Sequence, residues 1–142
     1  RRLRKHGIRV PRPISYHKNV LIMDLIGDSE ASPRLRDVII DEPYEVFIDL
    51  LEMVAVSWQK ANLVHADLSE YNILWNEGEP WLIDVGQGVT HQHPHAEEFL
   101  VRDVTRLVKW INKQGFEADL ADSMLRVLDE PVPELPELPG GD

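Results

Sequence analysis

Three polar residues constrain what this chain can form more than any other feature. Asn72 follows Asp67 by five positions, and Asp84 closes an apolar run that begins at Pro80. A carboxylate at the end of a buried strand is unfavourable unless a cation or hydrogen-bond donors satisfy it. Phosphoryl transfer from Mg-ATP uses such a set, because one carboxylate orients the attacking hydroxyl while an amide and a second carboxylate hold Mg²⁺ on the phosphates. These three residues are therefore our candidate site.

The sequence around the site predicts a β-hairpin. The hairpin would place Asn72 at the start of one strand and Asp84 at the end of its neighbour, while Asp67 lies on the preceding loop. All three side chains could then converge on one ion. The expected strands are residues 71–75 and 80–84, joined by the loop 76–79.

The combination of features carries this interpretation, because an aspartate and an asparagine at this spacing are common in turns and caps. His65 stands two residues before Asp67, and two apolar residues lead into Asp84. We expect His65 to hold the backbone of the loop rather than to shuttle protons.

Apolar residues at helical spacing predict three helices. The first covers 43–61 and begins at Pro43, the second covers 94–115 and ends at Gly115, and the third covers roughly 117–129. The expected buried positions are Phe47, Leu50, Leu51, Val54, Trp58 and Ala61 in the first helix, Leu100, Val104, Leu107, Val108 and Ile111 in the second, and Leu120, Met124, Leu125 and Leu128 in the third.

The other segments give coarser expectations. Residues 1–6 have the composition of a helix end, and residues 20–26 form an apolar run, closed by Gly27, that predicts a buried strand. Residues 28–42 are expected to form a loop or a short helix. The chain after Pro131 should be flexible or extended.

Composition narrows the class of protein. The 142 residues are 43% hydrophobic, which suits a single core, and they contain no cysteine for disulfides or thiolate metal sites. A net charge of −10 argues against a chain that coats nucleic acid through its overall charge. The basic residues 1–18 and the acidic residues 129–142 are interpreted as solvated ends. No membrane span or signal peptide is found, so a soluble, cytoplasmic protein is expected.

The motifs resemble those of the RIO family of atypical protein kinases, and most of all its first subfamily. The resemblance rests on residues 65–72, 83–89 and 93–103, and the segments 9–13 and 21–27 resemble that family's approach to the hinge and the hinge itself. Ordinary protein kinases would have Phe-Gly after the metal aspartate and a lysine two residues after the catalytic one. Val85-Gly86 and Ser69 stand at these positions, and both departures fit RIO proteins.

The resemblance implies an α+β fold, the C-terminal lobe of a kinase, mainly helical with a hairpin that carries the metal site and a hinge strand. It implies that Asp67 is the catalytic aspartate and that Asn72 and Asp84 bind Mg²⁺. The aspartate that matches Asp84 is also implicated as a phosphate acceptor, which fits an ATPase-like cycle. Asp103 would hydrogen-bond the catalytic-loop backbone.

The resemblance also implies an adenine pocket for ATP. The backbone of Asp24 and Ile26 would hold the adenine edge, with Met23 at the gatekeeper position. Leu74 and Ile83 would form the floor of the pocket.

Several parts of a kinase are not found in the sequence, namely a glycine-rich phosphate loop, a strand lysine and a helix glutamate. We therefore expect a piece of a longer kinase that binds ATP poorly and is inactive alone. Residues 1–27 would be the end of an N-lobe helix, an N-lobe strand and the hinge, residues 28–130 the C-lobe, and residues 131–142 a flexible acidic tail. The implied partners are ATP, a protein substrate or the chain itself, and a pre-ribosomal small subunit; residues 1–18 are compatible with RNA contact.

Three alternatives stay open. Small-molecule kinases of the aminoglycoside and choline type use a similar motif. The motif therefore predicts phosphoryl transfer but does not identify the molecule that accepts the phosphate. A pseudokinase scaffold is the second alternative. The third is a zinc module built on His91, His93 and His95, although Pro94 interrupts that row.

Overall fold

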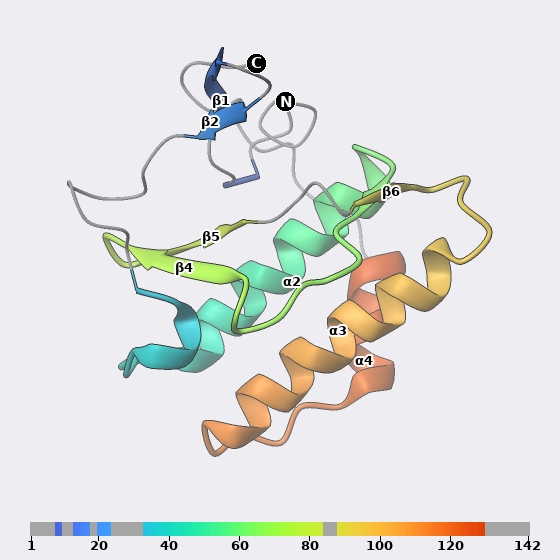
Figure 1. The fold of residues 1–142 in the computed structure, drawn as a ribbon. Helices are drawn as coiled ribbons and strands as arrows, with labels where there is room; N and C mark the ends of the chain where they lie inside the picture. The colour runs from blue at the N-terminus through green and yellow to red at the C-terminus, as the bar shows by residue number, and fades with distance from the viewer. Residues whose placement is uncertain (1–7, 10–12, 18–19, 24–32, 84–87, 130–142) are drawn as a thin grey trace.

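The computed structural model describes residues 8–9, 13–17, 20–23, 33–83 and 88–129. Its strands are β1 (Pro13–His17), β2 (Val20–Met23), β3 (Leu63–Val64), β4 (Ile73–Asn76), β5 (Glu79–Leu82) and β6 (Val89–Thr90), and its helices are the 3₁₀ turn η1 (Leu35–Asp37), α2 (Pro43–Gln59), α3 (Ala96–Lys113) and α4 (Leu120–Leu128). Figure 1 shows α2 at the centre, with the β4–β5 hairpin on one side of it and α3 and α4 on the other. This is the mainly helical α+β architecture that the sequence predicts.

Helix α2 is the centre of the hydrophobic core. It begins with Pro43, as predicted, because the missing N–H of proline is harmless in the first turn. The predicted stripe is buried, and so are Met53, Ala55 and Val56 outside it. The wider burial arises because strands cover one side of α2 while α3 and α4 cover another.

The predicted hairpin is present, with a tighter turn than expected. Asn76 pairs directly with Glu79, so Glu77 and Gly78 alone form the connection instead of the four residues 76–79. Both have positive φ angles, 52° and 77°. Left-handed backbone at both central positions is the geometry that matches the twist of a two-residue hairpin.

The predicted buried positions of α3 are confirmed, although the helix begins at Ala96 instead of Pro94. The expected face of α4 was half right: Leu120 and Met124 pack against the core, but Leu125 and Leu128 are 56% and 40% exposed while Ser123 and Val127 are buried. The Asp119 carboxylate accepts a hydrogen bond from the backbone N–H of Asp122 and so fixes the start of the helix. From that start, residues 120, 123, 124 and 127 share the face that packs on the core.

Two further short pairings of strands are antiparallel. Strand β1 pairs antiparallel with β2, which confirms the strand expected over 20–26 as far as residue 23. Strand β3 pairs with β6 and brings the start of the loop 65–72 beside the segment that leads to α3. The turn η1 falls in the predicted loop 28–42.

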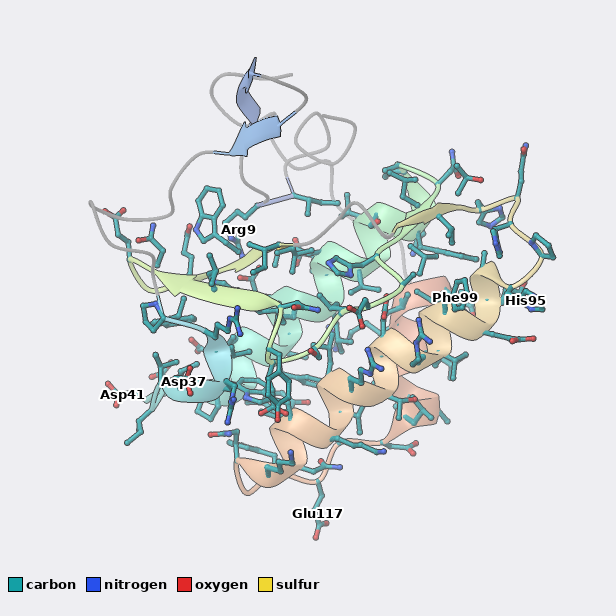
Figure 2. All side chains as sticks on the ribbon, viewed as in Figure 1. Arg9, Asp37, Asp41, His95, Phe99 and Glu117 are labelled. Carbon is teal, nitrogen blue, oxygen red and sulfur yellow. The ribbon has the colours of Figure 1, made fainter. Side chains whose placement is uncertain are left out.

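The segment at residues 8–9 joins the hairpin. Ile8 is fully buried, and the Arg9 carbonyl accepts a hydrogen bond from the backbone N–H of Leu82 at 2.8 Å. The Arg9 guanidinium donates to the Pro80 carbonyl at 2.9 Å and forms an ion pair with Asp49 of α2 (Figure 2). The expectations for residues 1–6, 24–27 and 130–142 lie outside the described residues. No helix in the described ranges combines the length and apolar composition that a membrane crossing requires.

Replacing Gly78 with alanine should destabilise the protein through backbone strain. Gly78 has φ 77° and no atom within 4 Å of an added Cβ, so the left-handed backbone is the sole penalty, about 1–2 kcal/mol. Urea unfolding measures the loss. Glu77→Asn is the control, since asparagine tolerates the left-handed region and should leave stability equal or higher. Equal midpoints for wild type and Gly78→Ala would contradict the assigned turn.

Candidate active site

The candidate catalytic loop begins where β3 ends and turns sharply at Ala66. The φ angle of Ala66 is 73°, a left-handed conformation that a residue with a Cβ adopts only where its surroundings impose it. Ala66 is itself buried, so solvent cannot satisfy its backbone groups. The loop therefore needs partners from elsewhere in the fold.

Asp103 of α3 supplies those partners. It is 1% exposed, and its two carboxylate oxygens accept hydrogen bonds from the backbone N–H of Ala66 at 2.9 Å and of Leu68 at 3.0 Å. Burial raises the pKa of the Asp103 carboxyl, while these two donors and the nearby Arg102 oppose the rise. The predicted contact between Asp103 and the loop backbone is confirmed.

His65 ties the loop to the end of the hairpin. Its Nδ1 accepts a hydrogen bond from the backbone N–H of Asp67 at 3.2 Å, so the ring proton belongs on Nε2. Nε2 lies 2.6 Å from the carbonyl oxygen of Ile83 and donates to it in this tautomer. The side chain is 8% exposed, and these contacts agree with the backbone-holding role that we expected.

Asp67 and Asn72 come together as the hairpin prediction requires. The Asn72 amide nitrogen donates to the Asp67 carbonyl at 2.8 Å and to its carboxylate Oδ2 at 3.2 Å. The other carboxylate oxygen of Asp67 accepts from Arg106 at 3.0 Å. The side chain is nevertheless 50% exposed, so the carboxylate is held on both oxygens and still open to an incoming group.

Asp84 lies outside the described residues, and its role as a metal ligand stays a prediction. The preceding residue, Ile83, is held beside Asn72, because its backbone N–H donates to the Asn72 carbonyl at 3.1 Å. The Asn72 amide nitrogen is directed to Asp67, which leaves its oxygen as the atom available to a cation. Oxygen is the ligand that Mg²⁺ prefers.

The predicted floor residues of the adenine pocket share one face of the hairpin. Ile73 and Leu82 pair across β4 and β5 and are buried towards the core. Side chains alternate along a strand, so Leu74 and Ile83 lie on the opposite face. Met23 is the last residue of β2, and Asp24 and Ile26 lie outside the described residues.

Sequence reasoning missed the cationic side chains of α3 that contact the loop. Arg106 binds Asp67, Arg102 donates to the Ala66 carbonyl, and the Lys113 ammonium lies 3.4 Å from Glu70. Their positions follow helical spacing around the same face, which is the signal that could have identified them.

A cavity of about 410 Å³ lies between the loop and α3. Asp67 is on its wall, together with Arg106, Lys109 and Lys113 of α3. Its lining residues are Asp67, Ser69, Glu70, Tyr71, Asn72, Arg106, Lys109 and Lys113.

The three histidines before α3 do not form a common metal site. The His91 ring packs on Trp58 at 4.3 Å between centroids, whereas His93 and His95 lie beside Phe99 at 5.5 and 6.3 Å. Figure 2 shows His95 and Phe99 together at the N-terminal end of α3. Within the described part of the chain, no group of three or more histidine or acidic side chains could hold a metal ion.

Comparison with known proteins decides the family. The RIO domain family model matches residues 1–123. The chain belongs to the RIO family of atypical kinases. It is 42% identical over 122 residues to the RIO-type serine/threonine-protein kinase Rio1 of Haloferax volcanii, a match that covers 83% of this chain and 41% of that protein.

Solved structures support the same fold for this RIO chain. The crystal structure of the Rio2 kinase from Chaetomium thermophilum superposes with a TM-score of 0.72 at 25% identity, over 94% of this chain and 44% of that one. The Rio2 kinase–ADP/Mg²⁺–phosphoaspartate complex from the same organism gives a TM-score of 0.67 at 24% identity, over 94% of this chain and 43% of that one. The kinase-like fold is therefore confirmed, and the RIO chain spans less than half the length of these relatives.

Replacing Asp103 with asparagine should lower the free energy of unfolding, because it weakens the contacts that hold the loop 65–72. Asparagine offers one oxygen in place of two, and its amide would face a buried backbone N–H, so a loss of about 2–3 kcal/mol is expected. Urea unfolding measures it. Asp129→Asn, at the exposed C-cap of α4, is the matched control and should change stability by less than about 0.5 kcal/mol. Equal losses in both variants would contradict the role given to Asp103.

Proposed function

We propose that this chain carries the catalytic loop and metal site of a RIO-type serine/threonine kinase, which transfers the γ-phosphoryl group of Mg-ATP to a protein hydroxyl or to water. One observation carries the proposal, namely that the half-exposed Asp67 carboxylate is held by Asn72 and Arg106 on a loop that the buried Asp103 fixes. Enzymes catalyse phosphoryl transfer mainly by positioning groups in this way and by stabilising charge.

In this proposal Asp67 accepts a hydrogen bond from the attacking hydroxyl. Arg106 and Asn72 fix the plane of the carboxylate, so its orientation is set before the acceptor arrives.

Asn72 and Asp84 would hold Mg²⁺, and the bound ion would neutralise charge on the phosphates. The free amide oxygen of Asn72 and the direct backbone link between Asn72 and Ile83 support this pairing. We also propose Asp84 as a phosphate acceptor. A Rio2 structure of the same fold is described as an ADP/Mg²⁺–phosphoaspartate complex, which is consistent chemistry in a relative.

The adenine ring would lie on Leu74 and Ile83, on the face of the hairpin that points away from the core. Met23 and the backbone of Asp24 and Ile26 complete the proposed pocket from the hinge side. The apolar floor suits a flat aromatic ring, and hinge backbone groups would supply its polar contacts.

The wider setting is also a proposal. We infer residues 1–27 as the end of the N-lobe with the hinge and residues 28–130 as the C-lobe. The chain alone would then bind ATP weakly, since the nucleotide would lack its N-lobe contacts. A role in maturation of the small ribosomal subunit, in the cytoplasm, is what the family resemblance implies.

Phosphate transfer from γ-labelled ATP tests the proposal in the full-length protein. Asp67→Asn keeps the shape of the carboxylate and removes its charge, so transfer should fall by about 10²–10⁴-fold. Label that reaches protein or water in wild type, and in neither Asp67→Asn nor Asp84→Asn, would support the assignment. Folded protein with Mg²⁺ that transfers no label would favour a scaffold without catalysis, and transfer to a small alcohol alone would favour a small-molecule kinase.

Nucleotide binding should separate the two aspartates. Asp84→Ala should weaken Mg-ATP binding because it removes a proposed ligand of the ion, whereas Asp67→Ala should largely spare binding because its contact is made chiefly in the transition state. Calorimetric titration with Mg-ATP measures both, and titration with metal-free ATP is the control. Equal Mg-ATP affinity in wild type and Asp84→Ala would contradict the metal assignment.

A further inference from the structure

We propose that Lys109, with Lys113 beside it, forms a subsite that selects acceptor hydroxyls flanked by acidic residues. The inference rests on the proposed function and extends it from the reaction to the class of protein acceptor. The cavity beside Asp67 is the place where such an acceptor would lie.

The first argument is the arrangement of cations on α3. Arg102, Arg106, Lys109 and Lys113 recur at intervals of three or four residues, so they follow one face of the helix. Three of them contact the catalytic loop in order along both segments: Arg102 binds the Ala66 carbonyl, Arg106 binds Asp67, and Lys113 pairs with Glu70.

Lys109 differs from its three neighbours. It lies between Arg106 and Lys113 in the row, is exposed, and lines the cavity. Across the ranges that the structure describes, no carboxylate or carbonyl oxygen pairs with it. Its ammonium is therefore an available positive charge next to the proposed catalytic carboxylate.

The dimensions suit a short peptide. Lys109 is three residues beyond Arg106, a rise of about 4.5 Å along the helix axis, and an extended peptide advances roughly 3.3–3.6 Å per residue. With the acceptor hydroxyl at Asp67, the Lys109 ammonium would face a side chain about one to three residues away in the peptide. The Lys113 side chain of the Lys113–Glu70 pair is 66% exposed and could exchange partners at small energetic cost.

The overall charge favours an acidic peptide over a nucleic acid. The chain has a net charge of −10, so a long polyanion would be repelled over most of the surface. Two carboxylates, Asp67 and Glu70, also line the cavity itself. One free cation flanked by such groups suits a single glutamate or aspartate better than a run of phosphates.

The reaction at this subsite is ordinary transfer. The acceptor oxygen forms a bond to the γ-phosphorus of ATP, the bond between that phosphorus and the β–γ bridging oxygen breaks, and ADP leaves with the bond electrons. The hydroxyl proton passes to Asp67 and then to solvent. Lys109 takes no part in these bonds and acts as a specificity residue.

The test compares two peptides with the full-length protein and γ-labelled ATP. One has a central serine flanked by glutamates, and the other carries glutamine in place of each glutamate. Wild type should have the higher kcat/KM for the acidic peptide. Lys109→Glu should lower kcat/KM for that peptide by about 3- to 10-fold, lower kcat/KM for the glutamine peptide by less, and lose its effect as salt rises. Lys109→Arg should restore the preference.

Arg126→Glu is the charge-matched control, because it makes the same change of charge on an exposed face of α4. Equal kcat/KM for the two peptides, or an equal loss in Arg126→Glu, would overturn the subsite. Label that reaches water but neither peptide would also overturn it and leave the proposed phosphotransferase standing.

A binding measurement keeps the two proposals separable. Fluorescence anisotropy of the labelled acidic peptide should show binding that Lys109→Glu weakens, whether or not transfer occurs. Such binding without any transfer would support the subsite and contradict the proposed function. Lys109-dependent binding of single-stranded RNA, with none of the acidic peptide, would overturn the subsite in favour of a nucleic-acid contact.

Discussion

The conformation of the candidate catalytic loop, residues 65–72, depends on one buried carboxylate. Asp103 is 1% exposed and directs both oxygens at backbone N–H groups on either side of Asp67, so it fixes the left-handed turn at Ala66 that no local sequence preference would produce. Asp103 can do this because α3 is itself immobilised by fully buried residues such as Val104 and Leu107. The packing of the core fixes α3, and two hydrogen bonds from Asp103 then fix the loop relative to α3.

A second set of contacts links the loop to the hairpin. His65 spans from the backbone of Asp67 to the carbonyl of Ile83, and the Asn72 carbonyl accepts from the N–H of Ile83. The loop 65–72 is thus hydrogen-bonded to Ile83 at the end of β5 through both a side chain and its backbone, and the His65 side chain that takes part is 8% exposed. Preorganised polar groups of this kind stabilise developing charge without rearranging during reaction. The proposed metal residue Asp84 follows directly from this fixed point.

The sequence predicted the features that depend on local spacing and missed those that depend on tertiary contact. The hairpin, the start of α2, the buried positions of α3 and the contact from Asp103 follow from periodicity, capping residues and motif. The two-residue turn at Glu77-Gly78 was set instead by strand twist, and the buried face of α4 by the cap at Asp119. Arg106 was not assigned, because helical spacing places it on one face with Arg102 and Lys113 but does not say which segment that face meets. The metal role of Asp84 remains a prediction, because Asp84 lies outside the described residues.

Helix α3 divides two tasks between two faces. Its apolar residues pack against α2 and α4, while Asp103 and the cations face the catalytic loop. In a chain with a net charge of −10, a row of four cations on one helix face is a local reversal of the prevailing charge. Three of those cations neutralise or orient groups of the loop, which leaves the excess positive charge at Lys109, beside an open carboxylate. Because fields at the surface are screened within about 10 Å at ordinary salt, this excess acts only on groups that enter the cavity itself. The same helix that positions the proposed catalytic carboxylate is thereby the element best placed to distinguish one proposed acceptor from another.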